Sequence, residues 1–132
     1  MNKKIAAKYV AAVNRGVKLL DVVRPGSVRA IDLGTIRLSS PAYCILGQLY
    51  GDFHDGATLL RCHALEIVRN LRLTHHAGLD EAAYGFNIFS CEAQAPSSGE
   101  SFSFLTELWA SVIEQRRAKD VAQERQRRTQ QS

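Results

Sequence analysis

Residues 101–113 read SFSFLTELWASVI, and this stretch decides the fold class. Its large apolar side chains recur at spacings of three and four residues, which places them on one face of an α-helix. The positions on that face are Phe102, Leu105, Trp109, Val112 and Ile113. Ser97 and Glu100 stand three residues apart ahead of it, which is the spacing of a capping box. We therefore expect a long helix that buries its tryptophan-bearing face in a core.

A second helical pattern occupies residues 2–23. Its apolar positions also repeat every three to four residues, at Ile5, Tyr9, Val13, Val17 and Leu20. Gly16 interrupts the pattern, at a cost of up to about 1 kcal/mol relative to alanine in a helix interior. A close crossing with another helix would explain a glycine at that position. Pro25 and Gly26 end the helix, because the residue before a proline avoids the α conformation.

A short third helix is expected over residues 41–50, which are apolar on nearly every side. Ser40 and Pro41 are typical of an N-cap and the first helical residue, and Gly51 stands where a left-handed C-cap belongs. These features predict a central, buried helix. The preceding residues 27–40 alternate only in part, so we expect an irregular segment or a short strand there.

The middle of the chain is expected to hold further short elements. Residues 52–56 have the composition of a polar loop, residues 57–73 form an amphipathic pattern, and Asp80 can cap a short helix over residues 81–84. A strand-like run follows at residues 86–89. Together these patterns predict a mainly α fold, a single compact domain of four to six helices with at most a small two-stranded β element.

Chain length and composition favour one globular domain. The chain has 132 residues, 45% of them apolar, and no apolar run approaches the length of about 18 residues that spans a membrane. Polar residues interrupt any signal-peptide core near the N-terminus, so residues 2–23 are expected to belong to the mature protein. We assign residues 1–117 to the globular, α-rich domain. Residues 118–132 form a charged tail that is expected to continue as an exposed helix or to fray.

Three cysteines, Cys44, Cys62 and Cys91, stand far apart in the sequence. An odd and scattered set favours reduced thiols over a disulfide framework. We expect each cysteine to be a small buried hydrophobic residue. The predicted localisation is therefore the cytoplasm.

Charge is distributed unevenly along the chain. Residues 1–37 carry eight Lys/Arg and two Asp, for a net charge of +6, and residues 114–132 carry six Lys/Arg and three acids, for a net charge of +3. Residues 38–113 carry three Arg and eight acids, for a net charge of −5. Basic ends around an acidic middle can steer a polyanion or an acidic protein face. They can equally hold the ends against the protein's own middle.

Several blocks of the sequence resemble a set of small uncharacterised proteins of phages and actinobacterial genomes. These blocks are residues 16–21 (GVKLLD), 31–33 (IDL) and above all 44–52 (CILGQLYGD), while residues 84–87 (YGFN) and 105–109 are similar in character. The chain differs in the segment over residues 61–76 and in having one cysteine before the Leu-Gly-Gln-Leu core. The resemblance carries no activity. It implies a phage or mobile-element product that acts inside a bacterial cell.

Two groups of side chains could carry chemistry by their identity. The possible zinc ligands are Cys44, His54, Cys62, His63, His75, His76 and Cys91. None of the usual ligand spacings occurs among them, so we expect no metal and no cofactor.

The second group is Asp52, His54 and Asp55, where neighbouring carboxylates would raise the pKa of the imidazole for general acid–base work. A small hydrolase or ligand-binding protein is therefore one alternative, and a polar turn explains the same residues. The sequence has neither a nucleophile motif nor a phosphate-binding glycine loop. We do not expect an enzyme.

Basic side chains on the first helix and in the tail are the candidate contacts to a partner or to nucleic acid. They are Lys4, Lys8, Arg15, Lys18, Arg116, Arg117, Lys119, Arg125, Arg127 and Arg128. Our leading hypothesis is a small non-catalytic binding protein, a phage or mobile-element accessory or inhibitor protein that acts on a host protein or nucleoprotein. The alternative is a nucleic-acid-binding regulatory module that uses these basic helices to contact phosphates. The oligomeric state stays open.

Overall fold

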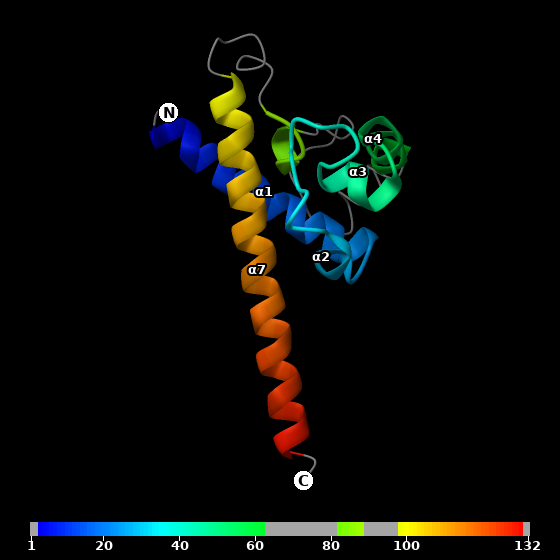
Figure 1. Cartoon of the computed structure of the whole chain (residues 1–132), viewed down its shortest axis with the longest axis vertical. Coiled ribbons are helices and arrows are strands. Elements are labelled where there is room, and N and C mark those ends of the chain that lie inside the picture. Colours follow the sequence, from blue (N-terminus) through cyan, green and yellow to red (C-terminus); the bar gives the residue numbers. More distant parts are fainter. Residues whose placement is uncertain (1–2, 63–81, 89–97, 131–132) are drawn as a thin grey trace.

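The computed structural model describes residues 3–62, 82–88 and 98–130. In these ranges the chain forms five α-helices and one 3₁₀ turn, with no β-strand (Figure 1). The elements in chain order are α1 (Lys3–Val23), α2 (Ser27–Ala30), α3 (Ile45–Tyr50), α4 (Phe53–Cys62), the 3₁₀ turn η1 (Ala82–Tyr84) and α7 (Ser98–Gln130). The predicted mainly α fold is confirmed.

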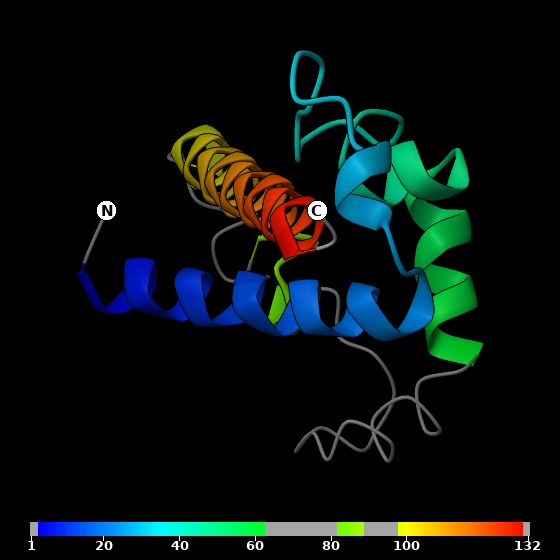
Figure 2. The same ribbon diagram turned by 90° about the horizontal axis from the view of Figure 1, so that it is seen from below.

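Helices α1 and α7 cross each other, and the core lies between them and the shorter elements (Figure 2). The two expected apolar faces meet there, because Tyr9, Val13 and Val17 of α1 are buried together with Leu105, Trp109 and Ile113 of α7. Helices α2, α3 and α4 lie together on one side of α7. Leu46 and Leu49 of α3 complete this core, with Tyr50 and Val112 half-buried at its edge.

The predicted close crossing at Gly16 is confirmed. A Cβ atom at Gly16 would overlap the carbonyl oxygen of Tyr84 and lie 2.9 Å from Cζ2 of Trp109. Trp109 is held there by a hydrogen bond from its Nε1 to the carbonyl oxygen of Gly85 at 2.6 Å. Its ring also stacks on Phe86, with ring centroids 5.6 Å apart. The glycine therefore lets α1 approach both the backbone of η1 and the indole of α7.

Helix α3 begins at Ile45, so the expected start at residue 41 is wrong. Cys44 is the N-cap, and its Sγ accepts a hydrogen bond from the Gly47 N–H at 3.2 Å. The carbonyl of Tyr43 cannot join the helix because it accepts from the Arg37 N–H at 3.1 Å and from a side-chain amide of α3. Ser40 still makes a cap-like contact, accepting from the Tyr43 N–H at 3.2 Å, but it caps a turn.

Hydrogen bonds and close packing within the fold explain several residues of the stretch 44–51. The Gln48 amide accepts from the Asp32 N–H at 2.6 Å and donates to the carbonyls of Asp32 at 3.2 Å and Tyr43 at 3.0 Å. A Cβ atom at Gly47 would overlap the Pro41 carbonyl oxygen. Gly51 has a φ of 91° and donates to the Gly47 carbonyl, which confirms the predicted left-handed C-cap. These side chains fix the irregular segment 31–44 against α3.

The segment over residues 27–40 forms the short helix α2 and then irregular turns, so the alternative of a short strand there is wrong. Gly26 in the left-handed region, with a φ of 83°, turns the chain into α2. The Asp32 carboxylate then accepts hydrogen bonds from the Gly34 N–H and the Thr35 hydroxyl, which folds the chain into a turn where alternation suggested an extended strand.

Three other expected elements differ from the structure. Residues 53–56 belong to α4, so the loop predicted over residues 52–56 is wrong beyond Asp52. The short helix expected over residues 81–84 is present as a 3₁₀ turn over residues 82–84, and residues 86–88 do not form a strand although Phe86 and Ile88 are buried. The predicted helix over residues 63–73 and the caps at Asp80 and Ser97 lie outside the described residues.

Candidate partner-binding surface

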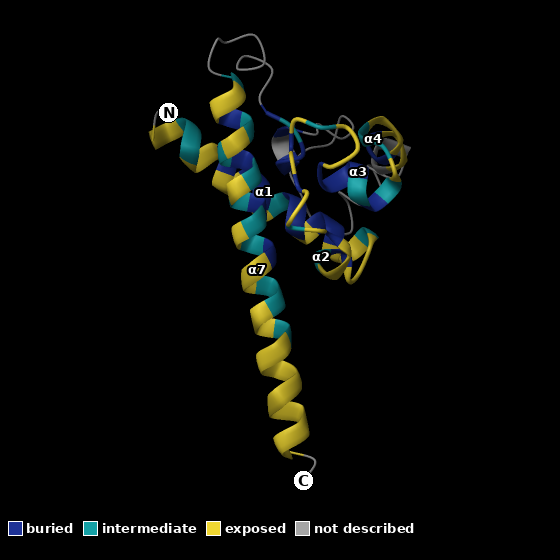
Figure 3. Cartoon of the chain, viewed as in Figure 1, coloured by how far each residue is buried: buried dark blue, intermediate teal, exposed yellow. Residues whose placement is uncertain are grey.

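Helix α7 extends beyond the rest of the fold. It has 33 residues, which corresponds to a length of about 50 Å. Residues 121–130 are all exposed, and this end of the helix projects away from the other elements (Figures 1 and 3). Of the two possibilities for the charged tail, its residues through Gln130 therefore continue as an exposed helix, without a break at residue 117. We call residues 121–130 the projecting half of α7.

Polar contacts anchor α7 where the projecting half begins. The Arg117 guanidinium donates hydrogen bonds to the carbonyl oxygens of Val28, at 2.8 Å, and Ile31. These are carbonyls at the end of α2, which the helix itself cannot satisfy. Arg116 forms an ion pair with Asp21 of α1 at 2.9 Å. Two of the basic residues proposed as partner contacts are thus engaged within the fold.

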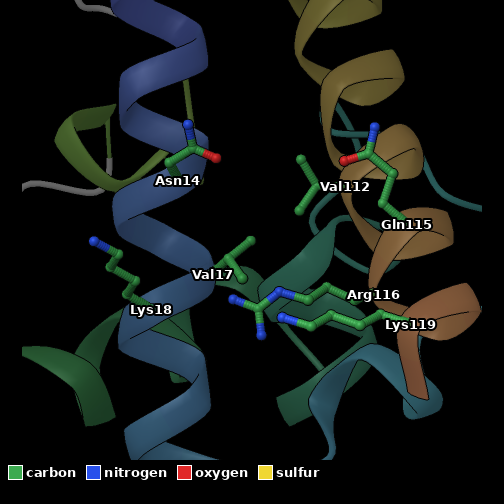
Figure 4. Close-up of a pocket in the computed structure, with 7 residues that line it drawn as sticks. All are labelled: Asn14, Val17, Lys18, Val112, Gln115, Arg116 and Lys119. Carbon is green, nitrogen blue, oxygen red and sulfur yellow. The ribbon is translucent and has the colours of Figure 1, made fainter. Parts of the chain in front are cut away.

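A groove of about 450 Å³ lies between α1 and α7, at the base of the projecting half (Figure 4). Val17 and Val112 form its apolar part, and the polar side chains that line it are Asn14, Lys18, Gln115, Arg116 and Lys119. Arg116 and Lys119 extend from α7 toward α1, whereas Lys18 lies at the rim and turns away from α7. The groove therefore brings together three of the predicted basic residues, from two helices far apart in sequence.

The remaining basic candidates lie elsewhere. Lys4 and Lys8 are exposed on the first turns of α1. This end of α1 lies next to the start of α7, since the ring of the neighbouring Tyr9 contacts that of Phe104 with centroids 6.2 Å apart. Arg15 is half-buried on the side of α1 that faces Tyr84. The exposed arginines of the projecting half stand at the opposite end of α7; they are Arg125, Arg127 and Arg128. The structure does not bring all ten candidates to one surface.

Residues 115–130 of α7 form two faces of different chemistry. At about 100° per residue, seven side chains fall within roughly 120° of arc and include no acid. These residues are Gln115, Arg116, Lys119, Gln123, Gln126, Arg127 and Gln130, which we call the amide-basic face. The acids lie on the other face, where Asp120 pairs with Arg29 at 3.6 Å and Glu124 with Arg128 at 3.0 Å. The pattern of net charge does not show this face, although the spacings of three and four residues between Gln123, Gln126 and Gln130 indicate it.

The Asp52, His54 and Asp55 cluster lies at the start of α4. The Asp52 carboxylate accepts a hydrogen bond from the His54 N–H at 2.9 Å, as an N-capping side chain does. Asp55 lies in the first turn, where the helix dipole favours a negative charge. The His54 ring is exposed and contacts the edge of Phe53. Both carboxylates thus have a role in the local fold.

The described residues contain no group of three or more His, Cys, Asp or Glu side chains that could hold a metal ion. Of the candidate zinc ligands, His63, His75, His76 and Cys91 lie outside the described ranges, as does the side chain of Cys62. Within the same ranges, no helix combines the length and apolar character needed to cross a bilayer.

Burial of Cys44 raises the pKa of its thiol above the ordinary value. We expect Cys44 in the folded chain to resist alkylation by iodoacetamide at pH 8 and to react once urea unfolds the chain, because the thiolate is the nucleophile. As the pH rises above about 8.5, the unfolded thiol ionises while the folded one stays protonated, so this group lowers the free energy of unfolding. Mass spectrometry of the alkylated Cys44 peptide measures the effect, and equal labelling in both states would contradict it.

No model of a protein family matches the sequence, and comparison with curated proteins and with solved structures gave no significant match.

Proposed function

We propose that the chain is a small non-catalytic binding protein that engages its partner through the projecting half of α7 and the groove at its base. One observation carries this proposal: residues 121–130 are a regular helix in which every residue is exposed. Such a segment adds little to a core, and an isolated helix of this length is marginal in water. A binding role explains why the helix continues past the last anchoring contacts.

Local contacts keep the projecting half ordered for such a role. Arg128 and Glu124 form an i, i+4 ion pair, and the Thr129 hydroxyl donates to the Arg125 carbonyl at 2.9 Å. Upstream, Arg117 fixes the direction of the helix through its two bonds to the end of α2. Side chains on the helix are therefore presented in fixed register, which lowers the entropy lost when a partner binds.

The partner we propose is a host protein or nucleoprotein, and the site of action is the bacterial cytoplasm. The resemblance of residues 44–52 to small phage proteins supports this setting, with the chain as an accessory or inhibitor protein. A hydrolase built on Asp52, His54 and Asp55 is less well supported, because the two carboxylates already serve the start of α4.

Deletion of residues 121–132 tests the proposal. The shortened chain keeps Arg117 and Asp120, so we expect its melting temperature to change by less than about 2 °C. Tagged full-length and shortened chains are then used as baits in a bacterial lysate, each with and without nuclease treatment. We expect the full chain to retain a component that the shortened chain does not. Identical retained components, or a shortened chain that fails to fold, would contradict the proposal.

A further inference from the structure

The amide-basic face differs from the rest of α7 in more than its charge. Among the described residues, Lys119 and Arg127 are the two cations of this face that form no ion pair, and Arg127 stands at its border with the acidic side. Gln123, Gln126 and Gln130 lie between and beyond them, all exposed. The face therefore offers a row of positive charges and amides along the projecting half, where none of the described elements covers it.

The chemistry of this row matches a nucleic acid better than an acidic protein. Lysine and arginine form charge-assisted hydrogen bonds with phosphate oxygens and with carboxylates alike, so the glutamines are what distinguishes the two partners. Glutamine adds a donor and an acceptor on one group, the combination that pairs with the N6 and N7 edge of adenine. A face that combines cations with glutamines can contact a phosphate backbone and base edges at the same time.

The diameter of α7 favours duplex DNA over duplex RNA as the ligand. An α-helix with its side chains is about 10–12 Å across, and the major groove of B-DNA is about 12 Å wide. The projecting half is about 15 Å long and every residue in it is exposed, so this segment is accessible to a groove of that width. The major groove of duplex RNA is too narrow for side chains to read.

We propose that the amide-basic face of α7 enters the major groove of duplex DNA, with Lys119 and Arg127 on phosphates and Gln123, Gln126 and Gln130 toward base edges. Lys18 at the rim of the α1–α7 groove turns away from α7, so its ammonium group is placed to contact phosphates that flank the segment bound by α7. Arg116 contributes less charge, because Asp21 already pairs with it. This inference rests on the proposed function, in which the projecting half is the binding element.

The test compares two double substitutions that remove the same charge from opposite faces. Lys119→Gln with Arg127→Gln neutralises the amide-basic face, and Arg125→Gln with Arg128→Gln neutralises the other face. All four side chains are exposed, and glutamine is close to lysine and arginine in helix propensity, so both variants should keep the circular dichroism of the natural chain. Fluorescence anisotropy with a labelled DNA duplex at two salt concentrations gives the affinity and its salt dependence. A duplex RNA and a poly-glutamate peptide are the comparison ligands.

We expect the first variant to bind the DNA duplex about tenfold more weakly and to lose about 1.8 from the salt slope, which is two phosphate contacts. The second variant should change the affinity by less than about threefold. Equal losses in both variants, equal affinity for poly-glutamate, or no DNA binding by the natural chain would overturn the inference. A lysate partner that still depends on residues 121–132 would then leave the proposed function standing, with a protein as the partner.

Discussion

Replacing Gly16 with alanine is expected to lower the free energy of unfolding by about 3 kcal/mol. The new Cβ atom would overlap the Tyr84 carbonyl oxygen and meet the Trp109 ring at 2.9 Å. A backbone oxygen cannot rotate out of the way, so α1 would have to move away from η1 and α7. The loss of packing at this crossing outweighs the gain of up to about 1 kcal/mol that alanine brings in helix propensity.

Gly99→Ala is the matched control. Gly99 lies in the first turn of α7, is exposed, and would have no atom within 4 Å of an added Cβ. This variant should be neutral or up to about 1 kcal/mol more stable. Urea unfolding followed by circular dichroism measures both variants. Equal stability of Gly16→Ala and Gly99→Ala would show that the crossing is not as close as described.

Trp109→Ala is expected to cost about 3–5 kcal/mol. Trp109 is 1% exposed, stacks on Phe86 and donates its indole N–H to the Gly85 carbonyl. Trp109→Phe keeps an aromatic ring but leaves that buried carbonyl without its partner, which should cost about 1–3 kcal/mol. Since Trp109 is the single tryptophan of the chain, unfolding is followed by circular dichroism.

Leu108→Ala provides the comparison for Trp109, because Leu108 is the preceding residue on α7 and is half-buried. It should cost less than Trp109→Ala, since less apolar surface is removed from the core. A larger loss for Leu108→Ala than for Trp109→Ala would contradict the assignment of the core.

The two long helices could be predicted because their signal is local. The repeats around Tyr9 and Val13 and around Leu105 and Trp109 each place one apolar face on a helix, and both faces are buried. The break at Pro25 and the glycine at the crossing also have local physical causes.

The start of α3 could not be predicted from local preferences. Ser40 and Pro41 favour a helix start, but the Tyr43 carbonyl is taken by Arg37 and by Gln48, contacts that depend on how segment 31–44 folds back. In the same way, the composition of residues 52–56 favours a turn. Instead, the Asp52 carboxylate accepts a hydrogen bond from the first turn of α4, which begins shortly after α3 ends. Helix boundaries here are decided by hydrogen bonds between segments.

The basic residues of the candidate surface could be predicted from the sequence, but their arrangement in space could not. Arg117 belongs by sequence to a basic tail, yet it bonds to carbonyls 89 and 86 residues earlier in the chain. Lys18 and Lys119 line one groove because α1 and α7 cross, and the helix that each one packs against is decided by tertiary packing. The amide-basic face follows from the sequence once α7 is known to continue to Gln130.

Amide hydrogen exchange of the full chain, with and without the partner it retains, tests the central claim most directly. In the free chain we expect faster exchange over residues 121–130 than over residues 101–113, because the first segment can open locally without loss of core packing and the second cannot. The partner should slow exchange over residues 114–130 and leave α3 and α4 unchanged. Slowing confined to residues 45–62, with residues 121–130 still exchanging fast, would contradict the claim that α7 is the binding element.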